Sequence, residues 1–225
     1  MTETMRPTDF IAAGEAAPAR PVHPRHAATL LLWRESDGGL EVLMGVRSVK
    51  HRFMPSRLVF PGGRVDLEDR TAPLLSELHP GTRRALERQA PPRLSRAIAV
   101  AAARELLEET GLILGRMEKG RLHADLAPMR YLCRAVTPPM SPVRFNARFL
   151  TAPAEAVSGE LAGSGELEHL EYHRVDSTPA HEMAPITAKV LKEFRDLMAL
   201  PEAERETRPM IWYQGRDTRR LERGG

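Results

Sequence analysis

Three glutamates within five positions, at the end of a predicted helix, constrain this chain more than any other feature. They lie in AAARELLEETGLILG, residues 101–115, just before Gly111, which stands where a helix C′ residue belongs. Like charges three or four residues apart destabilise a helix by about 0.2–0.5 kcal/mol per pair. Anions near the C-terminal end also oppose the helix dipole, at about 0.3–1 kcal/mol each. Glu105, Glu108 and Glu109 are therefore expected to have a compensating partner.

The position of the glutamates relative to the core favours a cation as that partner. At 100° per residue, Glu105 and Glu109 lie almost in line with the apolar Ile98 and Ala102. Semi-buried carboxylates in mutual contact raise one another's pKa unless a cation holds them. A hard divalent cation takes oxygen ligands and leaves room for a substrate phosphate. The alternative is a surface helix paired with arginines, and the helix alone leaves both open.

A glycine turn upstream favours the cation. In LVFPGGRVDLEDR, residues 58–70, Pro61-Gly62-Gly63 ends a short apolar run. Glycine allows positive φ and a close approach of backbone to a ligand, so a carbonyl near Gly62 could supply another oxygen to the same cation. A plain tight turn is the alternative, and it is the commoner reason for a Gly-Gly pair.

Length and composition exclude several other classes. The chain has 225 residues, of which 42% are hydrophobic, enough for one good core. No apolar run reaches about 18 residues, so no membrane span or membrane partner is expected. The single cysteine, Cys133, excludes a disulfide framework and a thiolate metal site, and a cytoplasmic location is expected. No Lys/Arg block with interleaved aromatics indicates a nucleic-acid surface.

The pattern of apolar residues predicts an α/β (α+β) fold, with a mixed sheet carrying helices on its faces. Residues 1–25 are expected to form a flexible segment, and residues 26–225 one domain. Ser95 is the expected N-cap of the long helix. Strands are predicted at 27–34, 40–47, 57–60, 130–136, 143–152, 166–175 and 209–215, and helices at 96–110 and 185–200.

The two motifs together resemble the box of the Nudix hydrolase family. Arg104-Glu105-Leu106-Leu107-Glu108-Glu109-Thr110-Gly111-Leu112 matches its second half, R-E-apolar-x-E-E-x-G-apolar, and Gly63 matches its glycine. The resemblance covers roughly residues 27–200. It implies a mixed sheet sandwiched between helices. It also implies Mg²⁺ or Mn²⁺, held by Glu105, Glu108, Glu109 and the carbonyl of Gly62, and hydrolysis of a nucleoside diphosphate linked to another moiety.

The box is split in this chain. Gly63 and Arg104 are 41 positions apart, farther than in the family pattern, so residues 66–94 form an insertion. It is expected to be helical and could cover the substrate mouth, and disorder is the alternative. The family glutamate that braces the arginine falls on Asp69 when counted from the glycine, and on Arg96 when counted from the arginine.

The identity of the brace stays open at this point. Asp66, Glu68 and Asp69 are the candidates.

A further stretch is similar to the signature of coenzyme A-hydrolysing Nudix enzymes. In LMGVRSVKHRFMPSRLVFPGG, residues 43–63, Arg47, Arg52 and the final FPGG match, whereas Ser56 stands where a glycine is expected. Arg47, Arg52 and Gly63 are the candidate substrate-binding residues, because arginine forks suit phosphate. The alternative is that Arg47 caps a strand edge and Arg52 is solvated.

The expected substrate is coenzyme A or acyl-CoA, cleaved to 3′,5′-ADP and (acyl-)4′-phosphopantetheine. ADP-ribose or NADH is the alternative substrate, and a non-catalytic nucleotide-binding sensor is the alternative of another class. A homodimer is left open.

The resemblance points to a glutamate that takes the proton of the attacking water. Glu105 is the candidate within the box, and Glu166 and Glu168, in GSGELEHLE, are candidates in a later segment. The alternative is that Glu166 and Glu168 are surface charges on a strand. Arg104 completes the set of catalytic candidates, with the role of orienting Glu105.

Overall fold

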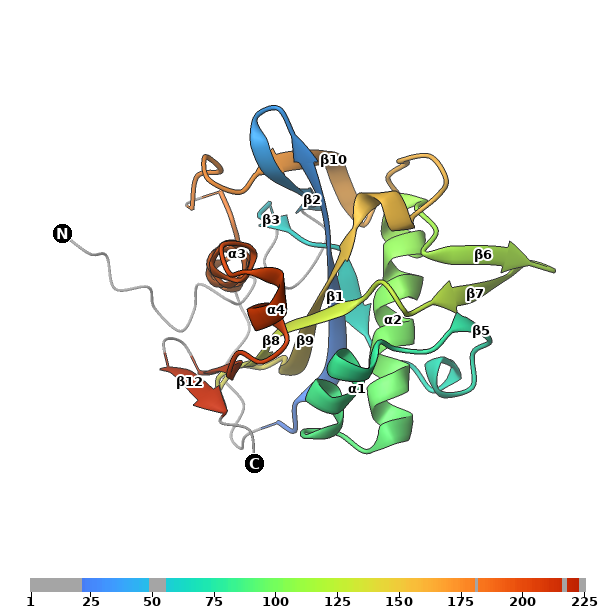
Figure 1. The fold of residues 1–225 in the computed structure, drawn as a ribbon, viewed down its shortest axis with the longest axis horizontal. Helices are drawn as coiled ribbons and strands as arrows, with labels where there is room; N and C mark the ends of the chain where they lie inside the picture. Colours follow the sequence, from blue (N-terminus) through green and yellow to red (C-terminus); the bar gives the residue numbers. More distant parts are fainter. Residues whose placement is uncertain (1–21, 49–55, 181, 216–217, 223–225) are drawn as a thin grey trace.

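The computed structural model describes residues 22–48, 56–180, 182–215 and 218–222. A mixed sheet forms the centre, with strand order β10-β2-β1-β9-β8-β11-β12; β3 and β4 pair with β2 and β1. Helix α2 (Pro92–Thr110) covers one face and α3 (Pro185–Met198) covers the other (Figure 1). The predicted mixed sheet between helices is confirmed.

The remaining elements connect these layers. The strands of the main sheet are β1 (Arg25–Ser36), β2 (Gly39–Arg47), β3 (Leu58–Val59), β4 (Gly62–Arg64), β8 (Arg130–Val136), β9 (Phe145–Pro153), β10 (Leu167–Arg174), β11 (Met210–Gln214) and β12 (Thr218–Glu222). A smaller sheet contains β5 (Leu74–Ser76), β6 (Gly115–Glu118) and β7 (Arg121–Asp125). The other helices are η2 (Glu68–Arg70), α1 (Pro80–Glu87), η3 (Ala154–Ala156) and α4 (Glu202–Arg205).

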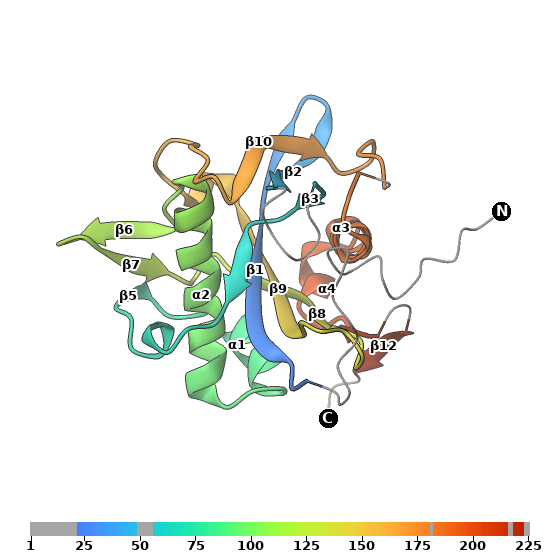
Figure 2. The ribbon, with the colours of Figure 1, turned by 180° about the vertical axis from the view of Figure 1, so that it is seen from behind.

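Strand β1 is apolar on both faces because both are covered. Its alternate residues Leu30 and Leu32 belong to the hydrophobic cluster that contains Leu106 of α2. Leu31 belongs to the cluster on the other face, with Phe194 of α3. Seen from behind, α2 runs beside β1 (Figure 2). The helix that carries the glutamates is thus anchored on the central strand.

The long helix α2 ends where it was predicted to end, but it begins earlier than predicted. It starts at Pro92, where a missing N–H costs nothing, so the prediction of Ser95 as N-cap is wrong. Ser95 lies inside the helix, and its hydroxyl donates to the Ala90 carbonyl at 3.2 Å. At the other end Gly111 has φ 76°, and its N–H donates to the Leu107 carbonyl, as expected of a C′ glycine.

The insertion of residues 66–94 is ordered and only partly helical. It contains η2, β5 and α1, and β5 pairs with β7 of a hairpin that the sequence pattern did not reveal. Leu78, Leu86 and Ala90 are buried in the cluster beneath α2. The insertion therefore contributes to the hydrophobic core.

Arg96 holds the insertion against α2. Its guanidinium donates to the carbonyl of Arg70 at 3.2 Å and to that of Ala72 at 2.6 Å. The side chain of Arg96 thus binds backbone carbonyls of the insertion. This contact gives a role to the arginine at the position where the family pattern, counted back from Arg104, has a glutamate.

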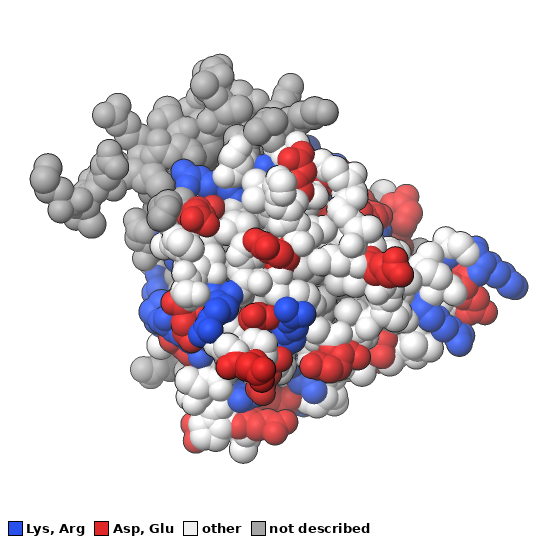
Figure 3. Space-filling view, turned by 90° about the horizontal axis from the view of Figure 1, so that it is seen from above, with Lys and Arg blue, Asp and Glu red and all other residues white. Residues whose placement is uncertain are grey.

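The expectations of a flexible N-terminal segment and of no membrane span can be compared with the described residues only. Residues 1–21 of the expected flexible segment lie outside them. Within them, none of the helices is long and apolar enough to cross a membrane. The face seen from above carries acidic and basic side chains interspersed (Figure 3).

Replacing Leu86 by alanine tests whether the insertion contributes to folding. Leu86 is 1% exposed, so Leu86→Ala should lower the free energy of unfolding by about 2–5 kcal/mol in urea titrations. Leu75, in the same insertion, is 49% exposed, and Leu75→Ala should stay within about 0.5 kcal/mol. Equal effects of the two variants would contradict a core role for α1.

Candidate active site

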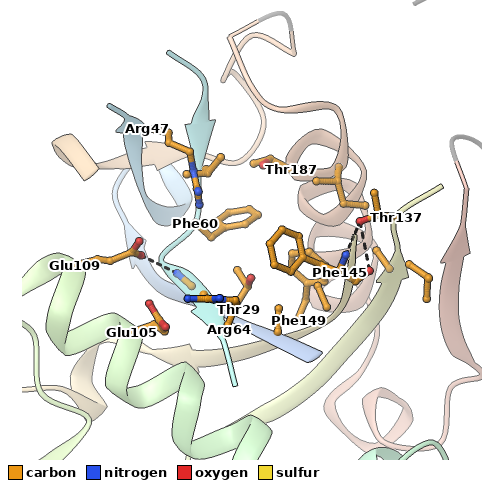
Figure 4. Close-up of a pocket in the computed structure, with 18 of the residues that line it drawn as sticks. Thr29, Arg47, Phe60, Arg64, Glu105, Glu109, Thr137, Phe145, Phe149 and Thr187 are labelled. Carbon is orange, nitrogen blue, oxygen red and sulfur yellow. Dashed lines mark hydrogen bonds between the residues drawn. The ribbon is translucent and has the colours of Figure 1, made fainter. Parts of the chain in front are cut away.

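A cavity of about 520 Å³ lies against the main sheet and reaches the last turns of α2 (Figure 4). Its size is typical of small-molecule sites. Arg64, Ala27, Ala147 and Ala135 stand opposite one another on β4, β1, β9 and β8, and all four line it. Opposite residues share a face of the sheet, so this row forms the floor of the cavity. The small side chains of its three alanines leave space above the sheet.

Aromatic side chains wall the cavity on the side away from α2. Phe145 and Phe149 lie two positions to either side of Ala147 on β9, and Phe60 faces them (Figure 4). Ile186 of α3 also lines this part. The cavity therefore has an apolar, aromatic end and, at α2, an acidic end.

The acidic end unites five carboxylates from three parts of the chain, and Asp66, at the start of the insertion, is one of them. Glu105, Glu108 and Glu109 of α2 and Glu166, just before β10, all line the cavity. Burial is the main cause that raises the pKa of Glu105, and it raises the pKa of Glu109 to about 8.

Arg104 binds two of these carboxylates and two groups that precede it in the sequence, the carboxylate of Asp69 and the carbonyl of Arg64. Its Nη1 donates to Glu105 Oε1 at 2.8 Å and to Glu108 Oε2 at 2.9 Å. Its Nε donates to Asp69 Oδ1 at 2.9 Å, and its Nη2 to Asp69 Oδ2 at 3.1 Å and to the Arg64 carbonyl at 2.8 Å. One guanidinium thus connects α2, β4 and η2.

These contacts identify the residue that braces the arginine. Asp69 is 1% exposed and makes both bonds of a fork with Arg104. The closest approach of Asp66 to Arg104 is 3.7 Å, and Glu68 is exposed. Of the three candidates, Asp69 fills the position, which agrees with counting from the glycine.

Glu109 has a different environment. It is 4% exposed, and its Oε2 accepts a hydrogen bond from the Gly62 N–H at 2.7 Å. It takes part in no ion pair within the described residues. The negative charge of Glu109, unlike that of Glu105 or Glu108, is thus not balanced by Arg104.

The glycine pair is required by close packing. A Cβ on Gly63 would lie 2.3 Å from Glu105 Oε1, and one on Gly62 would lie 2.5 Å from the Ala28 carbonyl. A side chain at position 62 would push β4 away from β1, and one at position 63 would displace the carboxylate of Glu105. The contact made by Gly62 is through its N–H, whereas a role for its carbonyl stays a prediction.

The donor set suits a hard divalent cation. Glu109 is a buried carboxylate with no ion pair in the described part of the chain, although the positive charge of Arg47 acts to lower its pKa. Glu105, Glu108 and Glu166 supply further oxygens beside it. As they stand, no three His, Cys, Asp or Glu side chains among the described residues are arranged as a metal site. Arg104 lies between Glu105 and Glu108.

Of the other predicted site residues, Arg47 and Glu166 line the cavity, whereas Glu168 does not. Arg47, at the end of β2, lines the cavity, and its Nε is buried with no hydrogen-bond partner among the described residues. Arg52 lies outside the described residues. The Glu166 carbonyl accepts from the Ser48 N–H at 3.2 Å, which fixes this segment beside β2. Glu168 is exposed on β10 and does not line the cavity.

Sequence reasoning missed Arg64, Thr187 and Lys189, which also line the cavity. Arg64 could have been found, because strand residues alternate between faces: if Gly63 faces α2, Arg64 must face the cavity. Thr187 and Lys189 lie at the start of α3, and no local signal indicates which side of the sheet that helix covers.

Comparisons with known proteins bear on the fold. No family model and no curated protein matches the chain. Among solved structures, it is similar to a NUDIX hydrolase from Alicyclobacillus acidocaldarius, with 26% identity and a TM-score of 0.55, over 76% of this chain and 90% of that one. It is also similar to a MutT protein from Methanosarcina mazei, with 13% identity and a TM-score of 0.51, over 82% and 100%.

A third similar structure is the MutT protein from Bacillus halodurans, with 12% identity, a TM-score of 0.50 and coverage of 88% and 97%. The two MutT likenesses concern the fold alone. The first supports the Nudix family and an enzyme that acts on phosphorus-containing anhydrides.

Replacing Asp69 tests the brace. Asp69→Asn removes the charge that Arg104 binds, so the free energy of unfolding in urea should fall by about 1.5–3 kcal/mol. If Arg104 orients Glu105, kcat should fall about tenfold as well. Glu68→Gln, a matched change at an exposed neighbour, should alter neither quantity. Lower stability with unchanged kcat would contradict a positioning role.

Proposed function

We propose that this chain, with its Nudix fold and split Nudix box, is a metal-dependent hydrolase that cleaves the pyrophosphate bond of a nucleoside diphosphate linked to another moiety. The observation that carries the proposal is the acidic end of the cavity, where Glu105, Glu109 and Glu166 meet beside Arg47. Carboxylates bind metal and activate water, and arginine binds phosphate. The cavity unites these groups in one space.

The residues proposed to hold Mg²⁺ or Mn²⁺ are Glu105, Glu108, Glu109 and the carbonyl of Gly62. When bound, the metal would neutralise phosphate oxygens and lower the pKa of a water molecule. Arg104 keeps Glu105 and Glu108 in place through Asp69. The N–H of Gly62 binds Oε2 of Glu109 and does not occupy its other oxygen, Oε1.

Glu166 is the proposed base that takes the proton from the attacking water. It lines the cavity and is exposed to solvent, whereas Glu105 is already bonded to Arg104. Glu105 remains the alternative base. The exposed Glu168 has no cavity contact to support such a role.

Coenzyme A or acyl-CoA is the proposed substrate. The support is the 43–63 signature, whose Arg47 lines the cavity, together with an aromatic end suited to a planar base. ADP-ribose or NADH remains the alternative substrate. A non-catalytic nucleotide sensor is the alternative of another class, but the presence of Glu105, Glu108 and Glu109 favours an enzyme. A cytoplasmic location and a homodimer stay expectations.

Product analysis tests the function. Incubation of the protein with coenzyme A and Mg²⁺ should yield 3′,5′-ADP and 4′-phosphopantetheine, detected by mass spectrometry. Glu109→Gln should lower kcat about 10²-fold or more, the scale of losing a key electrostatic contact. Cleavage of ADP-ribose or NADH alone would refute the coenzyme A assignment, and binding of nucleotide without any cleavage would favour the sensor.

A matched pair of glutamates tests the base. Glu166→Gln should reduce kcat by about 10²-fold or more, because general base catalysis contributes about 10²–10⁴-fold. Glu168→Gln removes an equal charge two residues away and should leave kcat within about twofold. A full loss in Glu105→Gln with normal turnover in Glu166→Gln would transfer the role to Glu105.

A further inference from the structure

We propose that Arg64 is a substrate-binding residue that, with Arg47, clamps the diphosphate on the two sides of the Gly62 turn. This inference rests on the proposed function for the identity of the ligand. It adds a residue that lies outside the box glutamates and outside the 43–63 signature.

The backbone aims Arg64 into the cavity. Gly63 points toward α2, where its missing side chain makes room for Glu105. Successive strand residues point to opposite faces, so Arg64 points away from α2. It stands opposite Ala27 on β1 and lines the cavity with it. Because Arg104 binds the Arg64 carbonyl at 2.8 Å, the position of Arg64 is tied to the helix that carries the glutamates.

The guanidinium of Arg64 has no partner among the described residues although several carboxylates line the same cavity. It makes no hydrogen bond or ion pair within the described residues, while the nearby Glu105 and Glu108 are bound by Arg104. Glu109 is held by the Gly62 N–H. Glu105, Glu108 and Glu109 thus have other partners, and the guanidinium of Arg64 stays available for an anion.

Arg47 is the second cation at this cavity, and it lies within electrostatic reach of Glu109. Its Nε is buried with no hydrogen-bond partner in the described part of the chain, and a buried unpaired donor costs about 1–3 kcal/mol or more. In Figure 4, Arg47 and Arg64 lie on the two sides of the contact between Glu109 and Gly62. An anion placed at this turn can reach both guanidinium groups.

The electrostatics of the cavity favour such a clamp. A diphosphate that approaches Glu105, Glu108, Glu109 and Glu166 meets like charge on one side. Two arginines facing the same space offset that repulsion and bind phosphate oxygens through directional forks. The two neighbouring phosphates of a nucleoside diphosphate match two guanidinium groups, whereas a single phosphate uses only one.

Calorimetric titration with ADP, in the absence of metal, tests the clamp. Arg64→Gln should weaken ADP binding about tenfold, which corresponds to about 1.4 kcal/mol, and Arg64→Lys should restore part of it. Arg93→Gln, a matched change at an exposed arginine outside the cavity, should bind like the wild type. The melting temperature should not change in Arg64→Gln, because this exposed side chain makes no hydrogen bond or ion pair with the residues that the structure describes.

Kinetics with coenzyme A separate this inference from the proposed function. Arg64→Gln should raise KM more than it lowers kcat. If the wild type cleaves coenzyme A while Arg64→Gln keeps both its KM and its ADP affinity, the clamp is refuted and the function stands. If the wild type cleaves nothing, but ADP binding still weakens in Arg64→Gln, the clamp stands and the function fails. A wild type without measurable ADP affinity would overturn the clamp.

Discussion

The ion-pair network of Arg104 is the interaction on which the site depends. The last turns of α2 carry three carboxylates that repel one another and oppose the helix dipole. Arg104 binds Glu105 and Glu108 and is itself held by the buried Asp69. Because the same guanidinium binds the Arg64 carbonyl, the glycine turn and the helix keep a fixed distance.

The network also explains how a split motif can remain whole in space. The insertion lengthens the chain between Gly63 and Arg104, but η2 places Asp69 against the arginine immediately after β4. The rest of the insertion then leaves the site, with Leu86 in the core and Arg96 binding its backbone. Asp66, at its beginning, is its only residue that lines the cavity among those described.

Much of the fold was predictable, because burial patterns repeat with the period of the element. A strand was predicted at 27–34, where β1 is observed with its leucines buried on both faces, and Gly111 indicated the end of α2. The start of α2 was misjudged because Pro92 at the first helical turn competes with Ser95 as a signal. The β6–β7 hairpin was missed since its strands are short and largely polar.

The candidate site was predictable where one local motif carries it, and not where the fold joins distant segments. The glutamates of α2 could be read from their spacing, but the choice of Asp69 over Asp66 and Glu68 needed the burial of one carboxylate. Glu166 and Arg47 meet α2 only because β10 pairs with β2. The distribution of charge is likewise a property of the folded chain: Arg104 and the Gly62 N–H bind the box carboxylates, while the Nε of Arg47 has no hydrogen-bond partner among the described residues.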